Sequence, residues 1–176
     1  VHVVSVDGEC RELLLLLGGH CLGPVSFHCV NLGRRPVAFC VQEAETVLPV
    51  VADVPLEYLY EPNASVLKAG VQDALCARFD VEKLHRNSNL FTASRLVENF
   101  PGRAFRVQAC HDFSKQSLKS LQAQMTKANL TVRNFPSTVE QLRKRLKLKD
   151  GGDVYLFATT LYGERHVLLQ CEKIKE

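Results

Sequence analysis

A cluster of cations around residue 145 is the part of the sequence best suited to chemistry. Residues 143–149 contain five Lys and Arg residues, and the larger block 114–149 contains nine against a single acid. The net charge of this block is +8, whereas residues 1–62 carry −5. Positive charge concentrated in this way is typical of a surface that binds a polyanion such as nucleic acid. The same pattern also fits helices whose cations only face solvent.

The helix that carries most of these cations is predicted from its start signal. Ser137 and Glu140 have the spacing of a capping box, in which each residue satisfies a backbone N–H group of the other. Pro136 keeps the preceding residue extended and so fixes where the helix can begin. Apolar residues then follow with helical spacing, at Val139, Leu142 and Leu146. Gly151 and Gly152 are expected to end this helix before a buried strand over 154–160.

A second basic helix is predicted just upstream. Ser114 is a suitable helix cap, and Lys115 and Lys119 lie one turn apart on the helix that follows. Its apolar stripe consists of Leu118, Leu121 and Met125. Strands over 104–110 and 130–135 flank this helix, and the unit can place them parallel in one sheet.

The N-terminal segment 1–42 is rich in short apolar stretches and turn signals, which predicts a small meander or ferredoxin-like sheet. Residues 43–62 are expected to connect this sheet to a helix over 63–79 that starts at Asn63. A short helical turn is expected over 80–85.

No catalytic or metal-binding motif emerges from the sequence. There is no phosphate-binding glycine loop, no nucleophile elbow and no paired zinc-ligand spacing. The pairs His20-Cys21 and His28-Cys29 do not match the spacing of a zinc site. His111-Asp112 has the composition of a catalytic pair but little specificity. We therefore expect no catalytic, cofactor-binding or metal-binding residue in this chain.

The seven cysteines are an odd number without a CxxC pair, which favours reduced thiols in a cytoplasmic protein. No secretory signal is visible, and no apolar segment approaches the roughly 20 residues of a membrane helix.

Four stretches resemble one protein family: residues 60–70, 83–94, 99–103 and 132–160. They are similar to the C-terminal region of bacterial class I S-adenosylmethionine-dependent methyltransferases that carry a THUMP-like domain. The most specific pieces are Arg133-Asn-Phe-Pro136 and Lys147-Leu-Lys-Asp-Gly-Gly152.

The resemblance implies an α+β fold in three parts. A small β-rich ferredoxin-like subdomain is expected over 1–60, and a connecting helix and loop over 61–99. A THUMP-like α/β domain with a mixed sheet and two basic helices is expected over 100–176. The methyltransferase domain, with its glycine-rich loop for S-adenosylmethionine, would precede residue 1, so no cofactor-binding residue can be assigned here.

THUMP domains are associated with RNA, so the resemblance implies a recognition role for tRNA or rRNA. The expected contacts are Arg133, Arg143, Lys144, Arg145, Lys147 and Lys149, extended by Lys115 and Lys119. Phe135 and Tyr155 either stack on bases or belong to the core.

A rival hypothesis is a scaffold domain that docks on its own N-terminal methyltransferase domain without binding RNA. A third is an independent enzyme that uses His111 or a cysteine.

Overall fold

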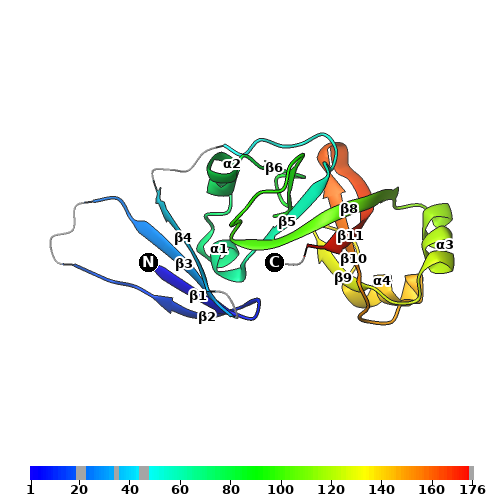
Figure 1. The fold of residues 1–176 in the computed structure, drawn as a ribbon, viewed down its shortest axis with the longest axis horizontal. Coiled ribbons are helices and arrows are strands. Elements are labelled where there is room, and N and C mark those ends of the chain that lie inside the picture. The colour runs from blue at the N-terminus through cyan, green and yellow to red at the C-terminus, as the bar shows by residue number, and fades with distance from the viewer. Residues whose placement is uncertain (19–22, 34–35, 44–47, 175–176) are drawn as a thin grey trace.

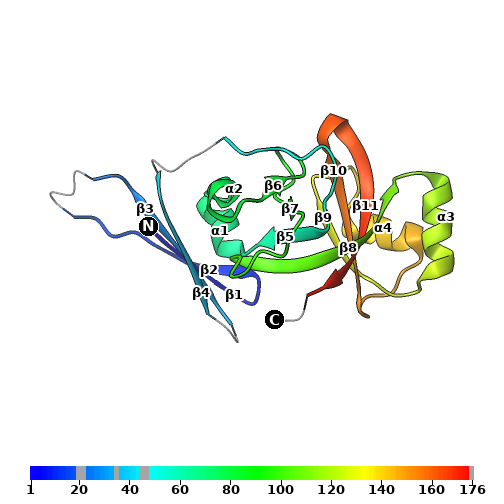
Figure 2. The ribbon, with the colours of Figure 1, turned by 45° about the horizontal axis from the view of Figure 1, so that its top comes forward.

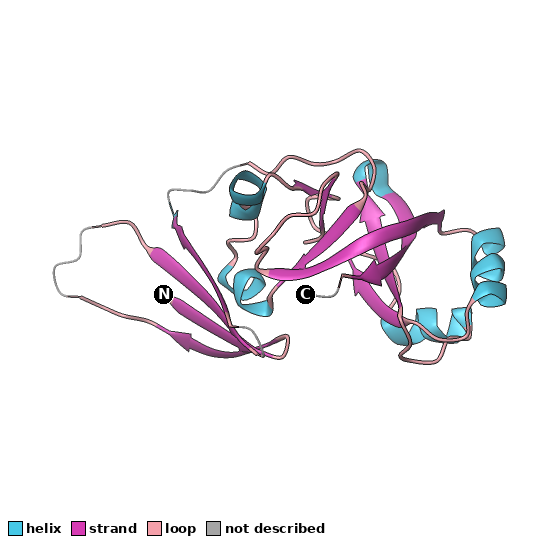
Figure 3. Ribbon diagram, viewed as in Figure 1, coloured by secondary structure: helices cyan, strands magenta, loops and turns pink. Residues whose placement is uncertain are grey.

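The computed structural model describes residues 1–18, 23–33, 36–43 and 48–174 of the chain. Strands dominate it (Figure 3). The first half contains β1 (His2–Val6), β2 (Glu9–Leu14), β3 (Ser26–Leu32), β4 (Val37–Gln42), β5 (Tyr58–Pro62), α1 (Ala64–Ala69), α2 (Ala74–Phe79), β6 (Glu82–Lys83) and β7 (Phe91–Ala93). The second half contains β8 (Gly102–Asp112), α3 (Lys115–Gln124), β9 (Asn129–Arg133), α4 (Val139–Leu146), β10 (Val154–Leu161), the 3₁₀ turn η2 (Tyr162–Glu164) and β11 (Arg165–Lys173).

The N-terminal strands form a separate four-stranded sheet with the order β2-β1-β3-β4. The predicted β-rich character is confirmed, but the sheet is not a meander, because β3 lies parallel to β1 and on the opposite side of it from β2. Val3 and Ser5 are buried while Val4 and Val6 are only partly covered, as expected for a strand with one covered face.

The remaining strands form a seven-stranded mixed sheet with the order β6-β7-β5-β8-β11-β10-β9. The α+β fold with a mixed sheet is therefore confirmed. Residues 61–99 do more than connect, since β6 and β7 extend this sheet beyond β5. The helical turn predicted over 80–85 is wrong, because Glu82 and Lys83 pair with β7 as a strand. The helix predicted over 63–79 is two helices, because Gly70 adopts a left-handed conformation (φ 73°) and ends α1.

The two basic helices each follow a strand of this sheet. β9 and β10 are parallel neighbours joined through α4. β8 and β9 are also parallel, as predicted, but β11 and β10 lie between them.

Three hydrophobic clusters hold these layers together. α3 and α4 cover one face of the sheet through Leu118, Leu121, Leu142, Leu146, Leu156 and Leu168. The opposite face encloses Leu59, Leu84, Phe105, Phe157 and Leu169, and we call this the inner face. A third cluster joins α1 and α2 to Cys29, Phe39 and Val41 of the N-terminal sheet.

The large sheet is strongly curled around its inner face. Arg133 on β9 reaches Glu61 on β5 at 2.8 Å, although three strands separate β9 from β5 in the sheet order. Strand twist accumulates in this way when a sheet wraps around its own core. Figure 2 shows β9 lying near β5 behind the crossing strand β8.

The molecule is elongated, with the N-terminal sheet at one end and α3 and α4 at the other (Figure 1). Among the described residues, no helix has the length and apolar composition that crossing a membrane requires.

Candidate nucleic-acid interface

The start of α4 is a capping box, one residue later than predicted. Thr138, not Ser137, caps the helix: its Oγ1 accepts from the Gln141 N–H at 3.3 Å. Gln141 Oε1 in turn accepts from the Thr138 N–H at 3.0 Å, so Gln141 takes the place expected for Glu140. A hydrogen bond with Thr138 lowers the pKa of the exposed Glu140 carboxyl. The predicted stripe is confirmed, because Leu142 and Leu146 are buried against the sheet.

The helix ends earlier than predicted. Lys147 adopts a left-handed conformation (φ 55°), and its N–H donates a hydrogen bond to the Lys144 carbonyl. The helix α4 therefore ends at Leu146. Gly151 and Gly152 also have positive φ but belong to the turn before β10. Lys147 and Lys149 therefore lie on a turn and not on the helix.

Several contacts bring the two basic segments into one surface. Lys115, Lys119 and Gln122 share a face of α3 by their spacing. Gln122 Nε2 donates to the Arg145 carbonyl at 2.7 Å, which joins α3 to α4. After α3, Lys127 forms a parallel bridge with Lys149. Charge from two segments of the sequence thus gathers at the end of the molecule occupied by α3 and α4 (Figure 1).

Six exposed lysines make up this surface, and none has an ion-pair partner among the residues that the structure describes. We call the set the lysine surface: Lys115, Lys119, Lys127, Lys144, Lys147 and Lys149. Five of them were predicted. Lys127 was missed, although it lies inside the same basic block.

The two predicted arginines of α4 are partly engaged within the protein. Arg143 forms a 2.8 Å ion pair with Asp150, whose side chain is exposed. The Arg145 guanidinium lies 4.7 Å from the ring centroid of Phe113, a cation–π contact. Both border the lysine surface, but each has less freedom to bind a phosphate than a free lysine.

Arg133 does not belong to this surface. Its Nη2 donates to Glu61 Oε1 at 2.8 Å, and Arg103 binds the other oxygen of the same carboxylate. Glu61 is only 4% exposed and lies on the inner face, away from α3 and α4. The prediction that Arg133 joins the helix cations is therefore corrected, because alternation along β9 points its side chain away from them.

The two aromatic residues left open by the sequence have different environments. Tyr155 packs on Phe105 of the inner face, with ring centroids 5.0 Å apart, and is a core residue. Phe135 is half-buried at the edge of the helix-covered cluster, in edge contact with Phe113 and His166.

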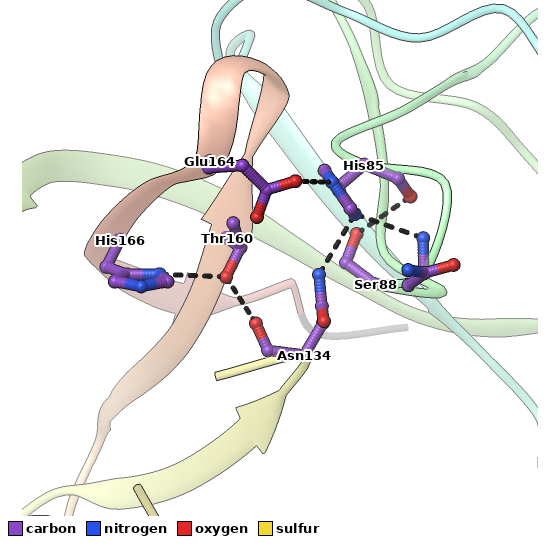
Figure 4. A network of polar contacts seen from close by, with 7 residues as sticks. His85, Ser88, Asn134, Thr160, Glu164 and His166 are labelled. Atoms are coloured by element: carbon purple, nitrogen blue, oxygen red, sulfur yellow. Dashed lines mark hydrogen bonds and ion pairs between the residues drawn. The ribbon is translucent and has the colours of Figure 1, made fainter. Parts of the chain in front are cut away.

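A polar network lies beside these aromatic rings, at the ends of β9 and β10 (Figure 4). The Thr160 hydroxyl donates to the Asn134 carbonyl and also contacts His166 Nδ1 at 3.0 Å. The Asn134 amide contacts His85 Nδ1 at 2.9 Å, and His85 Nε2 lies 3.1 Å from Glu164. The network joins the loop after β6 to β9, β10 and β11, and nothing in the sequence pattern predicted it.

The structure does not support the enzyme hypothesis that uses His111. Asp112 forms a 2.8 Å ion pair with Arg165, and this hydrogen bond raises the pKa of the Arg165 guanidinium. His111 Nε2 is buried, and none of the residues that the structure describes forms a hydrogen bond with it. Neighbours in a strand point to opposite faces, so this pair does not form a catalytic dyad.

No group of His, Cys, Asp or Glu in the described part of the chain has the geometry of a metal site. His28 contacts Cys40, at 3.2 Å, and not Cys29. His20 and Cys21 lie outside the described residues.

Comparison with known proteins gives two domain matches. Residues 102–173 match the THUMP domain-like family, and residues 58–101 match a family described as a ferredoxin-like domain. The THUMP-like match falls within the predicted range 100–176. The ferredoxin-like match lies on 58–101 and not on 1–60, where the sequence analysis expected it. The two matched segments share the seven-stranded sheet, because β5 pairs with β8 across their boundary.

One solved structure covers 99% of the chain: the crystal structure of a "putative methyltransferase" from Porphyromonas gingivalis W83, with a TM-score of 0.89 and 33% sequence identity. The chain spans 45% of that protein's length. No curated protein sequence matches the chain.

Proposed function

We propose that this chain is the RNA-binding region of an S-adenosylmethionine-dependent RNA methyltransferase whose catalytic domain lies outside residues 1–176. The observation that carries the proposal is the lysine surface, where six exposed cations gather without ion-pair partners in the described residues. Two findings support it: the THUMP-like match over the domain that bears this surface, and the similarity to part of a longer protein described as a methyltransferase.

The lysine surface suits phosphate groups better than base edges. Lysine is a flexible point charge that contacts a backbone without reading its sequence. The lysines of α3 and those of the turn at 147–149 can contact several phosphates along one nucleic-acid backbone. Such a surface positions a tRNA or rRNA and leaves the choice of nucleotide to other groups.

S-adenosylmethionine does not fit the residues present. A class I cofactor site uses a glycine-rich turn between a strand and the helix that follows it. The turns that lead into α3 and α4 are Phe113-Ser114 and Asn134-Phe-Pro-Ser-Thr138, and neither contains glycine. We therefore assign the cofactor and the catalytic residues to the rest of the parent enzyme.

The proposal places the protein in the cytoplasm. Six cysteines of the described residues are free thiols, as expected for a reducing compartment.

The test is RNA binding at increasing salt concentration. Bulk tRNA and a structured rRNA fragment are titrated with the protein between about 50 and 300 mM salt. Contacts to roughly five phosphates predict a slope of log affinity against log salt near −4. Absence of binding to both RNAs at the lowest salt would contradict the proposal.

A second function is favoured by the opposite end of the molecule. Leu13 to Leu17, on and after the edge strand β2, are each 50% exposed or more. Apolar surface of this kind marks protein contacts, and unpaired edge strands recruit further strands. We propose that this end docks on the methyltransferase domain of the parent enzyme, so that the protein is also a scaffold.

Salt distinguishes RNA binding by the lysines from a purely structural role of the same lysines. If the lysines serve only internal or interdomain packing, the midpoint of thermal unfolding falls as salt rises and no RNA binds. If they serve RNA, the midpoint changes little and only the affinity falls.

A further inference from the structure

A row of rings leads from the basic helix α4 to the start of β11. Arg145 lies over Phe113, the Phe113 and Phe135 centroids are 4.8 Å apart, and Phe135 meets His166 at 5.5 Å. The Phe113 N–H also donates to the His166 carbonyl at 3.0 Å. We call Phe113, Phe135 and His166 the aromatic row. It begins at the edge of the lysine surface, so a strand bound there has this row beside it.

The protonation of His166 follows from its neighbour Thr160. A hydroxyl has one proton, and Thr160 donates it to the Asn134 carbonyl. At the 3.0 Å contact between Thr160 Oγ1 and His166 Nδ1, the imidazole must therefore be the donor. The proton of neutral His166 is on Nδ1, and Nε2 keeps its lone pair.

A second histidine holds this arrangement in place. His85 Nδ1 accepts from the Asn87 N–H at 3.1 Å and faces the Asn134 amide at 2.9 Å, so its proton is on Nε2, which donates to Glu164. Asn134, in a left-handed conformation, is thereby fixed from both sides (Figure 4).

The two histidines differ in what they offer to a ligand. Both nitrogens of His85 are used within the network, and its side chain is 13% exposed. His166 is exposed, and its Nε2 has no partner among the residues that the structure describes. The network therefore presents one oriented hydrogen-bond acceptor to solvent.

A phosphodiester group has no hydrogen-bond donor, so the Nε2 acceptor must serve another group of a nucleotide. The donors on an unpaired RNA nucleotide are the 2′-hydroxyl group, the exocyclic amino groups of A, C and G, and the imino N–H groups of G and U. We propose that His166 Nε2 accepts a hydrogen bond from one of these donors on an unpaired nucleotide that lies against the aromatic row. Lys115 and Arg145, at the Phe113 end of the row, then hold the adjoining phosphates. This inference rests on the proposed RNA binding and adds a discriminating contact to it.

Four short oligonucleotides test the inference and separate the base donors from the 2′-hydroxyl. At the base, oligo(C) has an amino donor, oligo(U) has an N3–H donor and oligo(3-methyluridine) has neither. Oligo(U) and oligo(dU) differ chiefly by the 2′-hydroxyl. One hydrogen bond predicts a preference of about threefold to tenfold for the probe that has the donor.

The variant H166F keeps an aromatic ring against Phe135 but removes the acceptor. We expect H166F to bind the oligonucleotide that has the donor and the one that lacks it with nearly equal affinity. The slope of log affinity against log salt should stay unchanged. H2F, at the N-terminal sheet, is the matched control and should keep the preference.

Thr160 is a positioning residue, and T160V tests it with a different readout. Without the hydroxyl, the ¹⁵N chemical shifts of His166 should report a mixture of tautomers, and the preference should fall only in part. This variant also keeps the test open if H166F does not fold.

The outcomes are distinct. A preference that H166F abolishes supports the inference. No preference in the natural sequence, or one unchanged in H166F, overturns it while salt-dependent binding leaves the proposed function intact. If no RNA binds at low salt, the proposed function fails and this inference fails with it.

Discussion

Arg133 and the lysine surface have the same sign of charge and opposite roles. Arg133 and Arg103 both bind the carboxylate of Glu61, which is only 4% exposed at the inner face of the curled sheet. The lysines around α3 and α4 lie at the other face, without ion-pair partners in the described residues. The buried acid stabilises two arginines that would otherwise repel each other, whereas the lysines leave their charge available to a ligand. Available charge, and not total charge, therefore indicates where a polyanion binds.

The largest change in unfolding free energy is expected for a substitution on the inner face. E61A removes the shared partner and leaves two arginines facing each other in a half-buried site, which should cost about 3 kcal/mol of unfolding free energy. Urea unfolding followed by circular dichroism measures it. E12A, at an exposed glutamate of β2, should stay within about 0.5 kcal/mol. A loss below about 1 kcal/mol in E61A would show that the ion pairs do not hold the curled sheet together.

The lysine surface should show the reverse behaviour. K144E, K147E and K149E combined should weaken RNA binding on the order of 100-fold and make the salt slope shallower by about 2, since three phosphate contacts are lost. Unfolding free energy should change by less than about 1 kcal/mol.

The matched control for that triple variant is R11E, K68E and K173E combined, which reverses three exposed cations elsewhere on the protein. It should keep the affinity within about threefold. Equal losses in both variants would mean that only net charge matters and that no particular surface binds.

The interior of the curled sheet should respond to alkali. Burial raises the pKa of the Cys171 thiol to about 12, above the value of 9.0 for a free thiol. The unfolded chain therefore loses this proton first, so the stabilisation is complete below pH 9 and declines as the pH rises toward 12. The decline is about 1.4 kcal/mol per pH unit for one thiol.

Urea unfolding at pH 8, 9 and 10 measures this effect, and C171V should flatten the dependence by about the contribution of one thiol. Burial also raises the pKa values of Cys29 and Cys76 to about 11, so part of the decline should remain. Identical pH dependence in the two proteins would contradict the assignment.

The smallest effect separates backbone strain from charge at one residue. Lys147 has φ 55°, a conformation that disfavours any residue with a Cβ atom. K147G should raise the unfolding free energy by about 0.5–1 kcal/mol and lower RNA affinity a few-fold. K147A should lower the affinity equally but gain no stability. If both variants have the same stability, the strain is absent.

The sequence predicted local features well where one short segment determines them. The apolar stripe of Leu142 and Leu146 and the cap at Ser114 depend on neighbours a few residues away, and both are confirmed. The cap of α4 was placed one residue early because Ser137-Thr138 and Glu140-Gln141 offer two overlapping capping boxes. The helix end was placed late because a lysine, not a glycine, adopts the left-handed cap.

Contacts across the curled sheet could not be predicted in the same way. Glu61 and Arg133 are far apart in sequence and on strands that are not neighbours. Arg133 therefore counted as one more cation of the basic block. The only signal was an acid within the apolar strand Tyr58–Pro62, where an unpaired carboxylate would be costly. The polar network of Asn134 and His166 had no signal of its own.

The most direct test of the account is a map of backbone chemical-shift changes in the ¹⁵N-labelled protein as tRNA is added at low salt. We predict changes concentrated in residues 113–127 and 143–149 and at Phe135 and His166 of the aromatic row, with few at Glu61, Arg103 and Arg133 themselves. Changes concentrated around Arg103 and Arg133, or on the N-terminal sheet, would contradict the distinction between paired and available cations.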